Sequence, residues 1–211
     1  MKKICILDYG MGNIRSLKNS LVKIGYKVNF FSENNQIESN LLIIPGVGSF
    51  NTAMKLIKKK KIEVKIKNFL SNSNNNIVGI CLGKQLLYTS GFENGKTSGF
   101  DLINGTIDII SKKKDEIKLP NVGWQKIKIK EKLGKFKFLF KFNNQKFYFI
   151  HSFVASPINK NNILATSEYK NIEFCSISTN HKNVIGVQFH PEKSGDIGLD
   201  FLKVLITNLL L

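Results

Sequence analysis

Short apolar runs alternate with helix-like patterns through the first hundred residues. Four such runs, at 3–7, 27–31, 41–44 and 77–80, predict buried strands. Apolar residues recur at helical spacing over 14–24, and Gly25 ends that pattern. A second helix is predicted over about 52–70, and a third begins directly after residue 81. A repeated order of strand, turn and helix indicates βαβ units, with a mainly parallel sheet and helices on both faces.

The second half of the chain has a different pattern, with little helix between its apolar runs. The β-like runs lie at 103–110, 126–130, 146–150, 173–179 and 184–189. They predict antiparallel strands that either extend the sheet or form a flap beside it. An amphipathic helix is predicted over about 197–209. Because no repeat or proline-rich linker divides the chain, residues 1–211 are expected to form one α/β domain with a β-rich second half.

Composition excludes several classes of protein. The chain has 211 residues, and 42% hydrophobic content with 16 Phe is enough for a sizeable core and excludes intrinsic disorder. Its three cysteines, Cys5, Cys81 and Cys175, are too few for a disulfide scaffold. The N-terminal apolar run is too short for a signal peptide, and no run reaches the ~18 residues of a membrane span. We therefore expect a cytoplasmic protein with no membrane contact.

The positive charge suggests nucleic acid at first sight. The chain carries 32 Lys+Arg against 15 Asp+Glu, a formal net charge of +17. Only Arg15 is an arginine, and the lysine runs 58–61 and 112–114 have no interleaved aromatic residues. Arginine is the better residue for phosphate and base edges because of its planar fork. A solvated lysine-rich surface is therefore favoured over nucleic-acid binding, and a face that docks an acidic partner stays open.

The segment Gly79-Ile80-Cys81-Leu82-Gly83 joins a predicted strand to a predicted helix. Gly-x-Cys-x-Gly has the spacing of a nucleophile elbow, with Cys in place of Ser. Flanking glycines leave room for a sharp turn, and a helix N-terminus favours the thiolate form of cysteine. The N–H of Leu82 would then face a developing oxyanion. Cys81 is the candidate nucleophile; the alternative is a small packing residue, as expected for Cys5 and Cys175.

A thiolate nucleophile needs a base and a group that orients the base. His190 follows the run 184–189, and the next residue, Pro191, holds it extended. Glu192 is close enough to accept a hydrogen bond from the imidazole and fix its tautomer. His151 is an alternative base, although its place after an aromatic run favours the pocket wall or a structural role. His181 lies in a predicted loop and is given no role.

Two further glycine turns follow predicted strands. Pro45-Gly46-Val47-Gly48 would supply free N–H groups to an oxyanion hole, or is an ordinary loop. Since ligands of open α/β sheets bind at the carboxyl ends of the strands, these turns are expected to converge on one site. The turn at 8–13 lacks both the G-x-G-x-x-G spacing and a Walker lysine, so no nucleotide role is expected.

The segment from Gly79 to Gln85, together with His190-Pro191-Glu192, resembles the class I (triad) glutamine amidotransferases. Within that family, the segments at 8–13, 45–50, 123–124, 147–152 and 186–194 are similar to glutaminase subunits of imidazole glycerol phosphate synthases. They follow the family's order across nearly the whole chain. The resemblance implies one type 1 amidotransferase domain over 1–211, with a three-layer, flavodoxin-like fold and a mostly parallel central sheet.

The resemblance also implies the chemistry. Cys81 would attack the side-chain amide of L-glutamine to form a thioester, His190 would transfer the protons, and Glu192 would orient His190. The implied oxyanion and substrate contacts are Gly46, Val47, Gly48, Leu82, Gln85, His151 and Ser152. No metal or cofactor is implied.

The family's partner is a barrel-shaped cyclase subunit, with which the chain would form a heterodimer. Ammonia passes to that subunit, which makes imidazole glycerol phosphate and aminoimidazole carboxamide ribonucleotide in histidine biosynthesis. Asn13, Trp124 and Lys193 match positions on the family's docking face.

Two departures from the family pattern leave alternatives open. Lys84 stands where Met is usual, and residues 120–125 replace Pro-His-Met-Gly-Trp-Asn with Pro-Asn-Val-Gly-Trp-Gln. The second departure touches the partner-facing segment, so a paralogous glutaminase that supplies ammonia for amidated surface sugars is the alternative. A stand-alone cysteine hydrolase is disfavoured because no lid or substrate domain is evident. A non-catalytic partner protein is disfavoured by the intact Cys81, His190 and Glu192.

Overall fold

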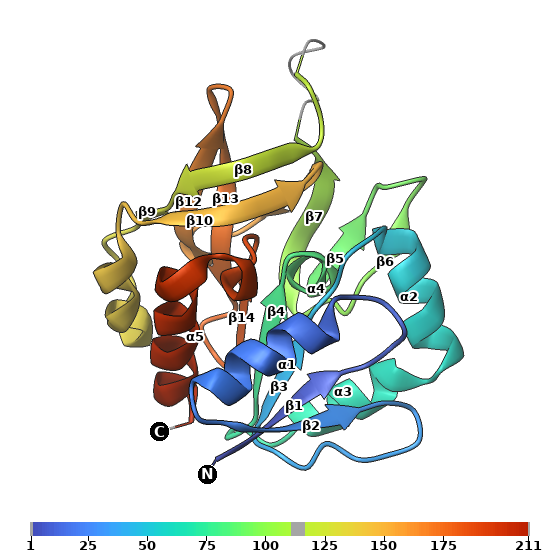
Figure 1. Ribbon diagram of the computed structural model, residues 1–211. Helices are drawn as coiled ribbons and strands as arrows, with labels where there is room; N and C mark the ends of the chain where they lie inside the picture. Colours follow the sequence, from blue (N-terminus) through green and yellow to red (C-terminus); the bar gives the residue numbers. More distant parts are fainter. Residues whose placement is uncertain (1, 111–116, 211) are drawn as a thin grey trace.

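The computed structural model describes residues 2–110 and 117–210, so the lysine run 112–114 lies outside the described residues. Within the described ranges, a large mixed sheet forms the centre of the molecule and a two-stranded ribbon crosses one end of it (Figure 1). Both chain ends lie at the opposite end of the sheet from this ribbon (Figure 1). No helix in these ranges has the length and apolar character needed to cross a bilayer.

Five neighbouring strands form the parallel part of the sheet, in the order β2-β1-β3-β4-β14. They are β1 (Lys3–Leu7), β2 (Lys27–Phe31), β3 (Leu41–Ile44), β4 (Asn76–Ile80) and β14 (Val184–Val187). The four predicted N-terminal strands are confirmed. Every residue of β3, β4 and β14 is buried, because these strands are covered on both faces.

Helices cover both faces, as predicted. α1 (Ile14–Lys23) and α5 (Gly195–Leu209) pack on one face, where their buried residues share a hydrophobic cluster with Ile4 and Val78. α2 (Phe50–Lys59), α3 (Ile62–Leu70) and α4 (Leu82–Leu86) pack on the other face. Figure 1 shows α1 and α5 on the near side of the sheet and α2 and α3 at its right-hand edge.

The β-rich half both extends the sheet and forms a flap, so both forms that its pattern predicted are present. The extension runs β14-β13-β11-β7-β5-β6, with β12 and β9 attached through β13. These strands are β13 (Ile172–Thr179), β11 (Phe153–Pro157), β7 (Ile103–Ile109), β5 (Tyr88–Gly91), β6 (Thr97–Ser98), β12 (Ile163–Tyr169) and β9 (Lys128–Ile129). The flap is an antiparallel ribbon of β8 (Asn121–Lys126) and β10 (Lys146–His151).

Aromatic side chains attach this ribbon to the end of the sheet. Phe147 of β10 stacks on Phe189 with ring centroids 4.3 Å apart, and Phe201 of α5 packs edge-on against both rings. Phe149 contacts Phe189 from a second side, with centroids 5.6 Å apart. The ribbon is therefore held over the carboxyl ends of β4 and β14, where the predicted site lies.

Several details differ from the sequence expectations. The helix predicted over 52–70 is two helices, because Lys61 adopts a left-handed conformation with φ of 53° between them. The run 184–189 was expected among the antiparallel strands, but β14 pairs parallel with β4 on one side and antiparallel with β13 on the other. The unpredicted elements are the strands β5, β6, β8, β11 and β12 and the 3₁₀ segments η1 (Gly134–Phe142), η2 (Lys160–Asn162) and η3 (Pro191–Lys193).

Candidate active site

Three turns meet at the carboxyl edge of the parallel strands. β3 leads into the turn at 45–48, β4 leads into Cys81, and β14 leads toward His190; these strands are adjacent in the sheet. A cavity of about 260 Å³ lies between the turns and the ribbon. Cys81 and His190 both line it, as do six of the seven residues predicted to contact substrate or oxyanion: Val47, Gly48, Leu82, Gln85, His151 and Ser152.

The seventh residue, Gly46, packs beneath the cavity. A Cβ added there would lie 2.6 Å from the Tyr9 hydroxyl and 2.9 Å from Cβ of Leu82. The Tyr9 hydroxyl also donates a hydrogen bond to the Pro45 carbonyl at 3.1 Å. The turn at 8–13 therefore supports the turn at 45–48 from below, which sequence analysis did not anticipate.

Cys81 occupies a strained backbone conformation, with φ of 53° and ψ of −109°. The flanking glycines have a steric reason. A Cβ on Gly83 would lie 1.7 Å from the Ile44 carbonyl oxygen, and one on Gly79 would lie 2.7 Å from Lys84. α4 can thus press against β3 and β4 only with glycine at both positions. The conformation is that of a nucleophile elbow, in which the surroundings hold a strained residue at the end of a strand.

The Cys81 side chain is 6% exposed and has two polar neighbours. Its thiol donates to the Ile150 carbonyl at 3.7 Å, and the Gln188 side-chain amide donates to Sγ at 3.8 Å. Gln188 is fully buried, and its Oε1 has no hydrogen-bond partner among the described residues. Sequence analysis did not single out Gln188, although its place two residues before His190 was a usable signal.

His190 is held in one orientation from two sides. Its Nδ1 donates to Oε1 of Glu192 at 2.7 Å, and its backbone N–H donates to the Tyr148 carbonyl of the ribbon at 2.9 Å. The Ser194 hydroxyl donates to the His190 carbonyl at 2.7 Å. Within the described part of the chain, Nε2 has no hydrogen-bond partner. The ring therefore offers a free nitrogen next to a carboxylate-backed Nδ1, which suits a general base.

The electrostatics around His190 favour its protonated form when Cys81 is a thiolate. Burial by itself lowers the pKa of His190, but the negative charges of the Cys81 thiolate and the Glu192 carboxylate outweigh burial and raise it to about 10. His190 is therefore suited to carrying a proton at neutral pH.

His151 lies in the wall of the cavity with both ring nitrogens engaged. Nδ1 donates to the Phe153 carbonyl at 3.1 Å, and Nε2 accepts from the Asn121 side-chain amide at 3.2 Å. Burial and the nearby charge of Lys84 lower the pKa of His151 to about 3. An imidazole in this state has no free lone pair, which favours the pocket-wall interpretation over a role as the base.

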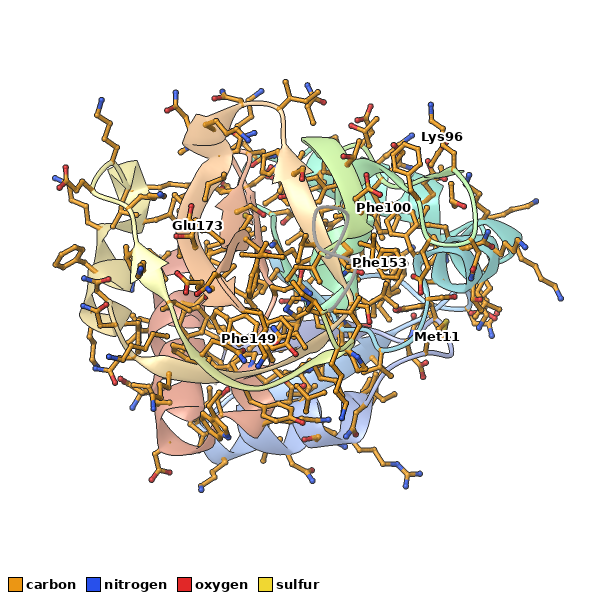
Figure 2. The ribbon with its side chains drawn as sticks, turned by 90° about the horizontal axis from the view of Figure 1, so that it is seen from above. Met11, Lys96, Phe100, Phe149, Phe153 and Glu173 are labelled. Atoms are coloured by element: carbon orange, nitrogen blue, oxygen red, sulfur yellow. The ribbon has the colours of Figure 1, made fainter. Side chains whose placement is uncertain are left out.

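Gln85 and His151 converge on one backbone carbonyl. The Gln85 amide donates to the Phe153 oxygen at 3.0 Å, so this oxygen accepts from both side chains. Figure 2 looks down on this end of the sheet and shows Phe149 and Phe153 on either side of the molecule's centre. Segment 149–153 is thereby fixed as one wall of the cavity, with Ser152 facing it.

The three predicted interface residues are exposed around this end of the molecule. Trp124 on β8 is 51% exposed and packs edge-on against Tyr148 of β10, with ring centroids 6.1 Å apart. Lys193 lies at the rim of the cavity, and Asn13 caps α1 by accepting a hydrogen bond from Ser16.

The cavity presents nucleophile and base chemistry. Cys81, a free histidine nitrogen and a supporting carboxylate are the groups needed for acyl transfer through a thioester. Over residues 2–110 and 117–210, no three or more His, Cys, Asp and Glu side chains group as metal ligands would.

Known proteins resemble this chain over nearly its whole length. A family model described as class-I glutamine amidotransferase matches residues 5–203. The imidazole glycerol phosphate synthase subunit HisH of Methanosarcina barkeri is 40% identical over 205 residues, covering 96% of this chain and 97% of the relative. The subunit of the same name from Oceanobacillus iheyensis is 37% identical over 201 residues, covering 95% and 96%.

Solved structures share the fold at low sequence identity. PurLQS from Thermotoga maritima superposes with a TM-score of 0.73 at 17% identity, covering 98% of each chain. A protein described as a glutamine amidotransferase gives 0.73 at 16% identity, covering 99% of this chain and all of the other.

Proposed function

The chain belongs to the class I glutamine amidotransferase family, and we propose that it is the glutaminase subunit of an imidazole glycerol phosphate synthase. It hydrolyses glutamine to glutamate and ammonia and supplies the ammonia to a cyclase subunit. The curated relatives that carry the synthase name match nearly the whole chain, which supports this assignment. The family match over 5–203 supports one amidotransferase domain over 1–211.

The reaction follows from the positions of three residues. The Cys81 thiolate attacks the side-chain carbonyl carbon of glutamine, and the carbon–nitrogen bond breaks as His190 gives its proton to the departing ammonia. Water then attacks the γ-glutamyl thioester while His190 takes a proton from it, and glutamate leaves. Glu192 accepts a hydrogen bond from Nδ1 at 2.7 Å, which leaves Nε2 as the nitrogen that exchanges protons with the reacting atoms.

The oxyanion of each tetrahedral intermediate needs donors close to Cys81. The backbone N–H of Leu82 and one from Val47 or Gly48 are the proposed donors, because these residues line the cavity beside the thiol. Gln85 and the segment His151-Ser152 bind the substrate glutamine in the same proposal. Gly46 gives the turn at 45–48 its close approach to Leu82.

One observation carries the proposal. Cys81, in its strained elbow, follows β4, and His190, with its free Nε2, follows the adjacent parallel strand β14. Both residues line the same cavity. A packing cysteine would need neither the strain nor the facing histidine nitrogen. A strained residue at a cavity mouth is the expected state of a nucleophile.

The partner is proposed to bind the outer face of the ribbon. Val122 and Trp124 of β8 pair with Ile150 and Tyr148 of β10, and together these four residues form the docking surface. Val122, Trp124 and Ile150 are exposed apolar residues, unusual so close together on a water-facing strand pair. Lys126, Lys146 and Lys193 are exposed near its edges, which suits a cyclase with an apolar patch bordered by acidic residues.

The test is Cys81→Ala in the reconstituted synthase. Glutamine-dependent formation of imidazole glycerol phosphate should fall at least 10³-fold, while added ammonia still supports the cyclase. The matched control is Cys175→Ala, a buried cysteine outside the cavity, which should retain glutamine-dependent turnover. Retained glutamine use by Cys81→Ala would exclude Cys81 as the nucleophile. If the chain hydrolysed glutamine but formed no imidazole glycerol phosphate with any cyclase subunit tested, its ammonia would go to a different acceptor.

A further inference from the structure

Lys84 is a fully buried lysine one helical turn after Cys81. Its side chain is 0% exposed, and its stem lies between two strands whose facing residues are glycine. A Cβ on Gly186 of β14 would lie 2.5 Å from Lys84 Cγ, and one on Gly79 of β4 would lie 2.7 Å from Lys84 Cα. The lysine therefore occupies space directly beneath the strand ends that carry Cys81 and His190.

The amino group of Lys84 has little to compensate for its burial. Nζ donates to the Cys175 carbonyl at 2.5 Å, and no described carboxylate forms an ion pair with it. A buried ammonium ion without a counter-ion is strongly unfavourable, so such groups are rarely retained without a role.

The titratable groups around Lys84 come from several elements. Cys81 lies on its own turn, Cys175 on β13, Tyr88 on β5, His151 on β10, and His190 after β14. Tyr9 faces Cys81 from the turn after β1, and Glu192 is already engaged with His190. In the proposed reaction, Cys81 is the member of this set that alternates between an anion and a neutral thioester.

We propose that Lys84 is a positioning residue that stabilises the Cys81 thiolate through its positive charge, from a buried position that does not line the cavity. The inference rests on the proposed role of Cys81 as the nucleophile. Lys84 touches neither substrate nor the reacting atoms.

The charge of Lys84 also affects the pKa of a residue in the cavity wall. Burial lowers the pKa of Lys84, while negative charge at Cys175 and at Cys81 and a hydrogen bond with Cys175 oppose that change. After burial, the charge of Lys84 is the largest cause that lowers the pKa of His151 on the far wall. The lysine is thus coupled to both sides of the site, as charges in a low-dielectric interior are.

The positive sign of the Lys84 charge determines the direction in which the ionisations of Cys81 and His190 shift. A positive charge favours loss of the thiol proton, and it also favours loss of the imidazolium proton. Lys84 therefore moves both ionisations of the coupled pair to lower pH, and its removal moves both to higher pH.

The experiment measures the alkylation rate of Cys81 by iodoacetamide in the full chain across pH 5–10, read peptide by peptide by mass spectrometry. In Lys84→Met, which keeps similar length without charge, the midpoint for Cys81 should rise by about one pH unit. Alkylation on the acid side of the midpoint should then be about tenfold slower. Lys55→Met removes an exposed lysine of α2 and should leave the midpoint unchanged.

Packing and charge are separated by a second substitution. Lys84→Leu changes the packing differently but loses the same charge, so its midpoint should match that of Lys84→Met. Unshifted midpoints in both folded variants would overturn the proposal. A wild-type Cys81 without enhanced reactivity near neutral pH would instead count against the proposed nucleophile.

Should neither variant fold, NMR of ¹⁵N-lysine-labelled protein supplies the answer. The ammonium titration of Lys84 should move to lower pH in Cys81→Ala than in wild type, because its counter-charge is gone. An identical titration in the two proteins would overturn the proposal.

Discussion

At the scale of single residues, the cavity shows how neighbouring charges give two similarly buried side chains different chemical states. His190 and His151 are both buried at its wall. His190 faces two negative groups, which raise its pKa to about 10, whereas burial and the charge of Lys84 lower the pKa of His151 to about 3. One imidazole is therefore suited to carrying a proton and the other to remaining neutral.

The neutral state of His151 makes stability depend on pH. The unfolded chain protonates this histidine near pH 6.5, whereas the folded chain does so only near pH 3, so acidification between these values favours unfolding. His151→Asn should reduce this loss by on the order of a few kcal/mol. Urea unfolding at steps from pH 7 to 4 measures the slope. Parallel slopes for the two proteins would show that His151 is not held neutral.

Cys81, His190 and Glu192 were predictable because they lie in two short motifs, Gly-x-Cys-x-Gly and His-Pro-Glu, whose residue types have a local steric or hydrogen-bonding reason. The burial of Lys84 was not predictable, and the only signal for the contact of Gln188 with Cys81 was its place two residues before His190. Lys84 is enclosed by Gly186 and Cys175, which belong to strands about a hundred residues further along the chain. Such neighbours are set by the order of strands in the sheet, which periodicity does not reveal.

At the scale of elements, the break between α2 and α3 lets both helices bury an apolar face in the same cluster. Ile57 of α2 and Ile62 and Ile66 of α3 are all fully buried on that side of the sheet. A continuous helix would rotate one set away from the sheet. Lys61 accommodates the change of direction in a left-handed conformation that suits glycine better than lysine.

Lys61→Gly is therefore expected to stabilise the protein by about 1 kcal/mol, because it removes the steric strain of that conformation. Lys55→Gly, in the middle of α2, should instead destabilise it by about 1 kcal/mol. Thermal or urea unfolding of both variants checks the opposite signs. Destabilisation by both would mean that lysine is unstrained at position 61.

The parallel strands and their helices were predicted because each is a long local pattern. Five strands were missed because they are short or mix polar with apolar residues: β5, β6, β8, β11 and β12. Pairing with other strands defines them, β5 and β11 with β7, β6 with β5, β8 with β10, and β12 with β13. The direction of β14 could not be predicted from its own residues either. A strand run fits either orientation until its neighbours are known.

At the scale of the whole molecule, the docking surface and the cavity lie at the same end of the sheet. Ile150 belongs to both, since its side chain is exposed on the ribbon and its carbonyl accepts from the Cys81 thiol. A partner seated on the ribbon would therefore lie beside the point at which ammonia is released.

Trp124→Ala should weaken partner binding by at least tenfold while leaving the unfolding free energy nearly unchanged. Its ring is 51% exposed, so little packing is lost in the free chain. Phe140→Ala is the control, since Phe140 is 55% exposed on η1 and is not one of the four residues of the docking surface. Calorimetric titration with the cyclase compares the two variants. Equal affinities of the two variants for the cyclase would show that the docking surface is not part of the interface.

The position of β14 between β4 and β13 has a consequence for biosynthesis of the protein. During translation, Cys81 is synthesised long before β14 and His190. Until that last strand inserts, the unfinished chain holds a cysteine without its proton acceptor, and the aromatic anchors of the ribbon lack Phe189 and Phe201. If Cys81 and His190 act as proposed, an unfinished chain is expected to lack glutaminase activity until its final strand has entered the sheet.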